Sequence, residues 1–124
     1  MRQQVLDEML VSGLRDWVQA SEVASLSMEV GGASTDSEIR TLSLTVIRDA
    51  LEQGLMTVGD LTREGFTPWG GEGEAAIHRV EASWLDLGRG PNLGEVCWLC
   101  NTDAGDIRAN QVLAGRREEP PTQA

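Results

Sequence analysis

The segment from Thr35 to Gly54 constrains the fold most, because it carries both ends and one face of a helix. Thr35 and Glu38 have the spacing of a capping box, in which two side chains satisfy free amide groups of the first helical turn. Gly54 occupies the position where a glycine commonly ends a helix. The sequence therefore predicts a helix over residues 36–53. Its apolar stripe consists of Ile39, Leu42, Val46, Ala50 and Leu51.

Two shorter helices are predicted before this one. Residues 3–12 carry apolar side chains at helical spacing, and Gly13 ends the run. Ser21 is a favourable capping residue for a second helix over residues 21–30. Between the two helices, residues 14–18 form a short apolar link that fits one extended rung. The N-terminal half of the chain is therefore expected to be helical.

Short apolar runs bounded by turn residues predict a small sheet in the second half. Residues 55–61 and 95–101 have the composition of strands, and residues 63–66 have that of a turn. Pro68 keeps the next segment extended or at a sheet edge, because proline has no backbone N–H for a ladder hydrogen bond. A fourth helix is expected between these strands, over residues 73–87.

The end of the chain is less strongly patterned. Residues 103–105 have turn composition, and residues 106–114 fit either a third strand or a short helix. Residues 115–124 are expected to be a disordered tail. Residues 1–114 then form one α+β domain, in which three helices precede a small antiparallel sheet with the fourth helix between its strands. This order resembles the winged-helix arrangement, and the likeness concerns the fold alone.

The run EVCWLCN contains both cysteines, Cys97 and Cys100, in a C-x-x-C spacing. A structural zinc site needs four ligands, and the chain adds only one histidine, His78, to the two thiols. In a strand, residues i and i+3 point to opposite faces, which keeps the two sulfurs apart. We therefore interpret the cysteines as packing residues on the two sides of a buried strand, and we expect no metal and no cofactor.

The charge of the chain disfavours several kinds of partner. Aspartate and glutamate total 20 against 10 basic residues, all of them arginine, so the net charge is −10. Such a surface repels the phosphates of nucleic acids and anionic membranes. The first residues show neither a signal-peptide pattern nor an apolar run of membrane-spanning length. We expect a cytoplasmic protein that binds another protein with a basic surface, and that binds neither nucleic acid nor membrane.

A series of short motifs runs from residue 54 to residue 102: GLMTVGDL, GFTPW and CWLCNT. These motifs resemble those of small, uncharacterised acidic bacterial proteins, mainly from actinobacteria, over less than half of the chain. Small acidic proteins of this kind include immunity proteins, which neutralise toxic enzymes, so the resemblance implies a class of function and identifies no site. The matching residues are Gly54, Leu55, Val58, Gly59, Asp60, Leu61, Gly65, Phe66, Trp69, Trp84, Pro91, Gly94, Glu95, Cys97, Trp98, Asn101 and Thr102.

Small size, strong acidity and the lack of a recognisable catalytic motif favour a non-catalytic protein-binding domain. The first hypothesis is an immunity- or antitoxin-like inhibitor of a basic toxin enzyme. Acidic inhibitors of this type mimic the charge of the substrate and associate quickly through electrostatic steering. The residues expected to contact the partner are Asp60, Glu64, Trp69, Glu72, Glu74, Asp103 and Asp106.

Two other hypotheses remain open. The first is a winged-helix-like regulator or a self-associating assembly module, in which Arg40 and the exposed start of the 36–53 helix make the contacts. DNA binding is disfavoured there, because Asp36 and Glu38 accompany this single arginine. The second is a small enzyme that uses carboxylates together with His78. A homo-oligomer is compatible with the module hypothesis.

Overall fold

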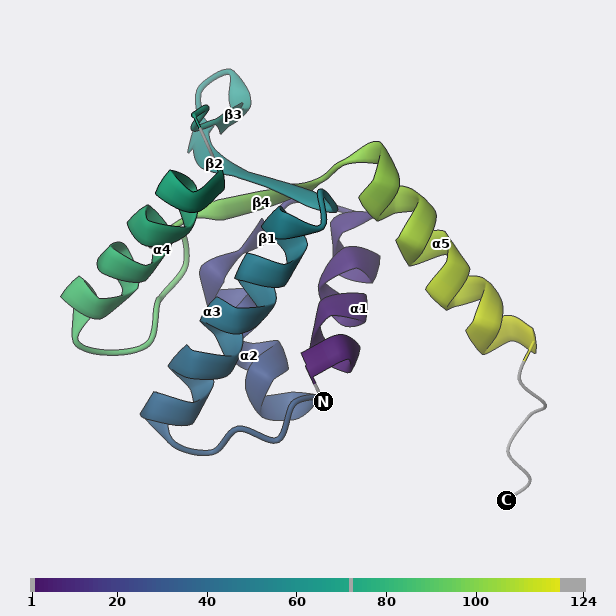
Figure 1. Ribbon diagram of the computed structural model, residues 1–124, viewed down its shortest axis with the longest axis horizontal. Coiled ribbons are helices and arrows are strands. Elements are labelled where there is room, and N and C mark those ends of the chain that lie inside the picture. The colour runs from purple at the N-terminus through teal and green to yellow at the C-terminus, as the bar shows by residue number, and fades with distance from the viewer. Residues whose placement is uncertain (1, 72, 119–124) are drawn as a thin grey trace.

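The computed structural model describes residues 2–71 and 73–118, with side chains described through residue 116 (Figure 1). Five helices and a four-stranded antiparallel sheet make up an α+β fold, as the sequence predicts. Figure 1 shows the sheet crossing the top of the molecule, four helices below it and the last helix alongside them. The helices therefore form a layer on one face of the sheet, and the hydrophobic core lies between the two.

The N-terminal half alternates helices with one very short strand. Its first elements are α1 (Arg2–Gly13), β1 (Val18–Gln19) and α2 (Ala20–Glu29). The predicted cap at Ser21 is wrong, because α2 begins directly after β1 and its capping residue, Gln19, makes no side-chain capping bond. Instead, the amide of Ala20 donates a hydrogen bond to the carbonyl of Cys97 over 3.2 Å. A contact between distant segments thus determines where the helix begins.

Helix α3 (Asp36–Glu52) confirms the capping box. The amide of Glu38 donates to Thr35 Oγ1 at 3.1 Å, and the amide of Thr35 donates to Glu38 Oε1 at 3.0 Å. Hydrogen bonds from the amides of Ser34 and Thr35 are the main reason that the pKa of Glu38 lies below its ordinary value. Gly54, with φ +69°, follows the end of the helix as predicted. These local signals explain why the prediction succeeds here.

The sheet brings together strands from both halves of the chain. The remaining strands are β2 (Met56–Thr62), β3 (Gly65–Pro68) and β4 (Trp98–Asn101). The strand order is β1-β4-β2-β3, and every neighbouring pair is antiparallel. Leu99 pairs with Val18 on one side and with Val58 on the other, and all three side chains are buried. The last strand of the chain therefore ties the first strand to the central hairpin.

Helix α4 (Gly73–Leu87) lies between β3 and β4 in the chain, as predicted. Its inner face buries Ile77, Val80 and Trp84, and the helix packs against α3. Up to β3, the order of elements follows the winged-helix-like sequence of helix, strand, two helices and hairpin. The insertion of α4 and the return of the chain as β4, between β1 and β2, distinguish this fold from that simple order.

Strand β4 is shorter than the predicted 95–101, because the backbone turns sharply before it. Val96 has φ +73°, a conformation that strains a β-branched residue, and the amide of Cys97 donates to the carbonyl of Glu95 at 3.0 Å. Cys97 therefore precedes the strand and is buried in the core, whereas Cys100 lies within the strand and is half-buried. Both thiols are free. Burial raises the pKa of Cys97 to about 12 and also raises that of Cys100.

Helix α5 (Asp103–Glu118) covers the predicted turn, the ambiguous 106–114 segment and the first residues of the predicted tail. Thr102 Oγ1 accepts a hydrogen bond from the amide of Gly105 at 3.1 Å and donates one to the carbonyl of Gly54 at 2.6 Å. The same threonine thus caps the new helix and joins it to the end of α3. Residues 119–124 lie outside the described residues.

Contacts with α1 explain why α5 forms where the local pattern is weak. The two helices pack along each other, and Ala109 is fully buried between elements of the core. Arg108 lies 3.3 Å from Asp7, and Arg116 forms an ion pair with Glu8. Because these carboxylates belong to the other end of the chain, a reading of neighbouring residues could not detect the partner of this helix.

Candidate protein-binding surface

Four of the predicted contact residues lie at the hairpin end of the molecule. Asp60 is on β2, Glu64 is in the turn between β2 and β3, Trp69 follows β3, and Glu74 lies in the first turn of α4. Glu72 falls outside the described residues. We call the set Asp60, Glu64, Trp69 and Glu74 the hairpin-end surface. Asp60, Trp69 and Glu74 lie where the hairpin meets α4, whereas Glu64 lies at the tip of the hairpin.

Arg79 of α4 contacts two residues of the hairpin-end surface, Trp69 and Asp60. Its guanidinium carbon lies 3.7 Å from the centroid of the Trp69 ring, and one of its nitrogens lies 3.7 Å from a carboxylate oxygen of Asp60. A cation over the face of an indole is attracted by the negative face of the ring. Trp69 is half-buried and has one face occupied by this arginine. The ring therefore offers a partner less contact area than an open tryptophan would.

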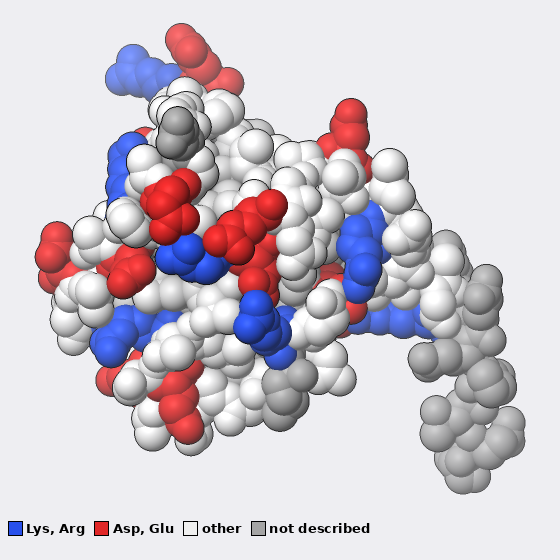
Figure 2. Space-filling view, viewed as in Figure 1, with Lys and Arg blue, Asp and Glu red and all other residues white. Residues whose placement is uncertain are grey.

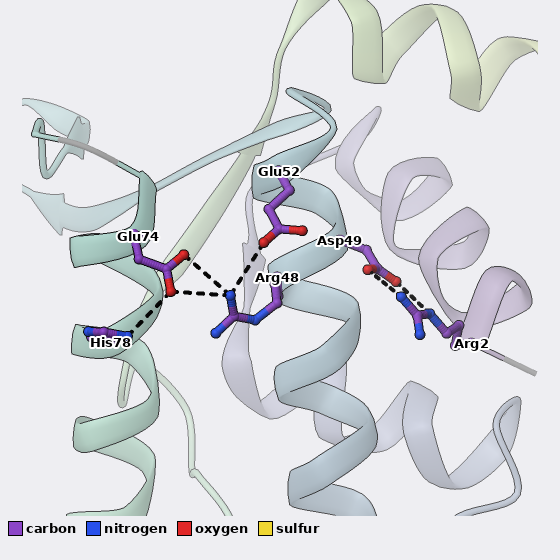
Figure 3. A network of polar contacts seen from close by, with 6 residues as sticks. All are labelled: Arg2, Arg48, Asp49, Glu52, Glu74 and His78. Atoms are coloured by element: carbon purple, nitrogen blue, oxygen red, sulfur yellow. Dashed lines mark hydrogen bonds and ion pairs between the residues drawn. The ribbon is translucent and has the colours of Figure 1, made fainter.

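Glu74 belongs to a chain of polar side-chain contacts between α3 and α4 (Figure 3). Arg48 lies 3.3 Å from Glu74 and 3.3 Å from Glu52, and His78 lies 3.3 Å from Glu74. Hydrogen bonds to Glu52 and then to Glu74 raise the pKa of Arg48. All four side chains reach solvent, and that of His78 is 70% exposed. The histidine and its carboxylate partner therefore lie on open surface.

Asp103 and Asp106 lie apart from the hairpin-end surface, in the first turn of α5. The amide of Thr102, just before α5, donates to the carbonyl of Leu55, just before β2. Glu64 lies beyond the other end of β2, and a strand of that length spans about 20 Å. Asp106 is half-buried and accepts a hydrogen bond from Asn101 Nδ2 at 3.1 Å. The predicted contact residues therefore fall into two separate groups.

Ion pairs within the chain neutralise most of the arginines, so the open charges are mainly negative. Figure 2 shows arginine and acidic side chains interleaved over one face. Six arginines have a carboxylate within 4.0 Å: Arg2, Arg48, Arg79, Arg89, Arg108 and Arg116. Among the described side chains, the arginines without such a partner are Arg15, Arg40 and Arg63. The described acids without one are Asp16, Glu22, Glu29, Asp36, Glu38, Glu64, Glu81, Asp86, Asp103 and Asp106.

A second surface, which the sequence did not reveal, is a groove between three helices and the loop after α4. We call it the α2–α4 groove. Its volume is about 550 Å³, which is within the range of ligand pockets. Three well-exposed apolar side chains line it: Leu93 is 81% exposed, Leu85 51% and Met28 45%. Asp36 and Arg40 of α3 also line the groove, and the buried Trp84 forms part of its floor.

The loop on the rim of the α2–α4 groove has a defined conformation. Arg89 Nη1 and Nη2 donate to Glu95 Oε1 and Oε2 at 2.7 and 2.9 Å, and the amide of Asn92 donates to Glu95 Oε1 at 2.7 Å. The bond from Arg89, followed by that from Asn92, lowers the pKa of Glu95 to about 2. The amide of Gly94 donates to Gln19 Oε1 at 2.7 Å. These bonds hold the loop that presents Leu93.

The sequence offered only a weak signal for the groove. Met28, Leu85 and Leu93 come from α2, α4 and the following loop, so no single stretch contains the apolar cluster. Leu85 follows the inward-facing Trp84 on α4 and lies outside the buried face of that helix. The sequence signal for the groove was therefore one long apolar side chain, Leu85, at a helix position that faces outward.

The outer face of the sheet carries a smaller apolar cluster. Trp17 and Leu61 are exposed, and the Trp17 ring lies 6.3 Å from the half-buried Phe66 ring, between centroids. Phe66 pairs with Leu61 across β2 and β3. Trp98 is half-buried rather than fully buried, on the strand beside them. Trp17, which was not among the predicted contact residues, is thus more exposed than the predicted contact residue Trp69.

The described residues, 2–71 and 73–118, contain no group of three or more histidine, cysteine, aspartate or glutamate side chains placed to hold a metal ion. None of their helices has both the length and the apolar character to cross a membrane. Comparison of the chain with protein-family models, with curated proteins and with solved structures finds no match.

Proposed function

We propose that this chain is a non-catalytic protein-binding domain of the immunity or antitoxin type, which inhibits a toxic enzyme with a basic surface. The observation that carries the proposal is the charge imbalance left after internal pairing: among the described side chains, ten acids but only three arginines lack a partner of opposite charge within that same set. Such an excess attracts a cationic protein and steers its approach. The two free thiols fit the reducing cytoplasm, which we propose as its compartment.

Among the predicted contact residues, Glu64 and Asp103 are the best placed for a basic partner. Both are exposed, and neither has a basic side chain within 4.0 Å among the described residues. Asp60 and Glu74 are also exposed, but Arg79 and Arg48 already neutralise them. A partner must compete with these arginines for the two carboxylates. Glu64 and Asp103 therefore contribute first to association in this proposal.

The experiment that tests the proposal combines the purified protein with enzymes encoded beside its gene. Nuclease or other toxic activity is measured while the protein is titrated in. We expect inhibition that saturates at a fixed ratio of the two proteins, and an association rate that falls as salt is added. Glu64→Arg should slow association several-fold. Glu29→Arg is the matched control, because Glu29 is an exposed acid on α2, far along the chain from the hairpin.

Either of two results contradicts the proposal. One is that no enzyme encoded beside the gene is inhibited at any ratio of the two proteins. The other is that inhibition occurs without any dependence on salt or on the charge at position 64, which removes the electrostatic basis of the proposal. Equal effects of Glu64→Arg and Glu29→Arg indicate general steering by net charge, and they reject the hairpin-end surface as the contact.

The element order favours a second candidate, a winged-helix-like regulator. Helix, strand, two helices and a hairpin occur in that order from α1 to β3. Asp36 and Glu38 are exposed at the start of α3, where a DNA-binding helix normally presents cations. A regulator with this surface therefore acts through protein contacts rather than on DNA. A DNA-mobility assay at low salt checks this version, and a shift of the DNA band contradicts it.

A further inference from the structure

We propose that the α2–α4 groove is a self-association surface, on which two copies of this chain meet about a two-fold axis. The inference is independent of the proposed inhibitory function. It rests on three features of the groove: an apolar projection beside an apolar hollow, a balanced pair of open charges, and a rim loop held in place by its own hydrogen bonds.

The apolar part of the groove is complementary to itself. Leu93 projects from the rim, with 81% of its surface exposed, next to a hollow of about 550 Å³. The hollow is bordered by Met28 and Leu85, which are also exposed. In a two-fold interface the same patch serves both copies, so a projection of one can enter the hollow of the other. Each Leu93 then becomes buried against Met28 and Leu85 of the second copy.

The charges of the groove favour a second copy over other occupants. Asp36 and Arg40 lie one turn apart on α3, and among the described residues neither has an ion-pair partner. Arg89, the other charged residue of the groove, is neutralised by Glu95. The groove is thus a locally neutral area on a chain of net charge −10. Across a two-fold axis, Asp36 of each copy can pair with Arg40 of the other.

Neutrality matters because two copies repel each other over most of their surface. Like-charged molecules associate only where few charges of one sign meet, and salt screens the remaining repulsion. A strongly basic partner, by contrast, gains little from a neutral groove and binds better to the open acids elsewhere. The two kinds of partner therefore use different areas of the same molecule.

The rim loop lowers the cost of association. The bidentate bond between Arg89 and Glu95 and the bond from Gly94 to Gln19 already fix the backbone on either side of Leu93. A side chain presented by an ordered loop loses less conformational entropy on binding than one presented by a mobile loop. Figure 1 shows the first turn of α3 and the last turn of α4 at the same end of the molecule, so the charged and apolar parts of the groove are neighbours.

Analytical ultracentrifugation of the full chain tests the proposal over a range of protein concentrations. We expect a monomer–dimer equilibrium that strengthens as moderate salt screens the net charge. A chain that stays monomeric up to its solubility limit overturns the proposal. So does assembly that continues beyond the dimer, because a two-fold interface closes.

Leu93→Asp locates the interface. We expect the dimer dissociation constant to rise at least about tenfold, since the substitution places a carboxylate in the apolar hollow twice per dimer. Ile107→Asp is the matched control, because Ile107 is an apolar residue of α5 that is 60% exposed and does not line the groove. Equal effects of the two substitutions, or a dimer that Leu93→Asp leaves intact, reject this surface. Because both positions are well exposed, we expect both variants to fold, and circular dichroism checks this.

A charge exchange tests the two-fold geometry. Asp36→Arg alone and Arg40→Asp alone should each weaken the dimer several-fold, because each places like charges opposite one another. The double variant Asp36→Arg/Arg40→Asp should restore it. If the double variant is as weak as the single ones, the two residues do not face each other and the two-fold arrangement is wrong. A small molecule or an unrelated apolar segment in the groove shows no such restoration.

Discussion

The hairpin-end surface and the α2–α4 groove differ in how their charges and apolar groups are used. At the hairpin end, Asp60 and Glu74 are paired with arginines, and the ring of Trp69 is covered by one of them. In the groove, Asp36 and Arg40 have no partner among the described residues, and Leu93 is almost fully exposed. Most of the predicted contact residues at the hairpin end are thus already bound to other side chains of the chain. The groove residues Asp36, Arg40 and Leu93 are not engaged in this way within the described part of the chain, and they remain free to contact a partner.

Residue type alone is a poor guide to which surface can bind a partner. A carboxylate that already has an arginine within 4.0 Å offers a partner little, because the partner must first displace that arginine. An exposed leucine between unpartnered charges offers more, since its burial removes apolar area from water without breaking an existing bond.

Trp84→Ala should damage the groove most, because the ring forms part of its floor and is only 3% exposed. We expect the free energy of unfolding to fall by about 3–5 kcal/mol, from lost apolar burial and the cavity that remains. Urea unfolding followed by circular dichroism measures the change. Trp17→Ala, at an exposed tryptophan, is the control and should cost far less. Similar losses at the two positions would show that the groove floor is not part of the core.

Gly59→Ala should disturb the hairpin end and leave the groove intact. A Cβ atom at position 59 would clash with the backbone carbonyl oxygen of Thr67, so one of two paired strands must move. We expect a loss of about 1–3 kcal/mol in the free energy of unfolding, as for other overpacked sites. Thermal or urea unfolding provides the value.

The control for Gly59→Ala is Gly73→Ala, which replaces another glycine of the same region. No heavy atom lies within 4 Å of a Cβ built at Gly73, and the residue begins α4, where alanine is favourable. The control should be neutral or slightly stabilising. If it costs as much as Gly59→Ala, the effect at position 59 comes from backbone entropy and not from the contact with Thr67.

The Arg89–Glu95 bond should make the rim loop sensitive to acid. The pKa of Glu95 falls from 4.5 to about 2 in the folded protein, so the folded state holds the carboxylate more strongly than the unfolded chain does. Its contribution to stability is therefore complete above about pH 4.5 and is lost as pH falls toward 2. Urea unfolding gives the free energy of unfolding of the wild type and of Glu95→Gln at each pH. The difference between the two values should shrink as the pH falls from about 4.5 toward 2. If the difference stays constant over this range, the pKa of Glu95 is not lowered in the folded protein.

The Arg48–Glu74 pair should matter least. Both side chains reach solvent, and exposed ion pairs add little to stability because water and salt screen them. A double-mutant cycle with Arg48→Ala and Glu74→Ala should give a coupling energy well below the effect of Trp84→Ala, and added salt should reduce it further. A large coupling would mean that α3 and α4 depend on this pair for their packing, and it would make the hairpin end as dependent on Glu74 as the groove is on Trp84.

Local signals were sufficient to predict three of the helices closely. The capping box of Thr35 and Glu38 acts within one turn, and Gly54 ends α3 through its own backbone, so neither requires knowledge of the rest of the chain. Helices α1 and α4 follow from apolar residues that recur within a few positions. The prediction that Cys97 and Cys100 share one strand was wrong for Cys97, because β4 begins at Trp98 and the backbone turns at Val96.

Contacts between distant segments account for what could not be foreseen. Helix α5 rests on α1, and β4 enters between β1 and β2. The arginine partners of Asp60 and Glu74 come from other elements, so the sequence could not show which acids remain open. The α2–α4 groove exists only because α2, α3, α4 and a loop meet in space. Pattern along a chain determines which segments form helices and strands, whereas the packing of those segments determines which side chains are left for a partner.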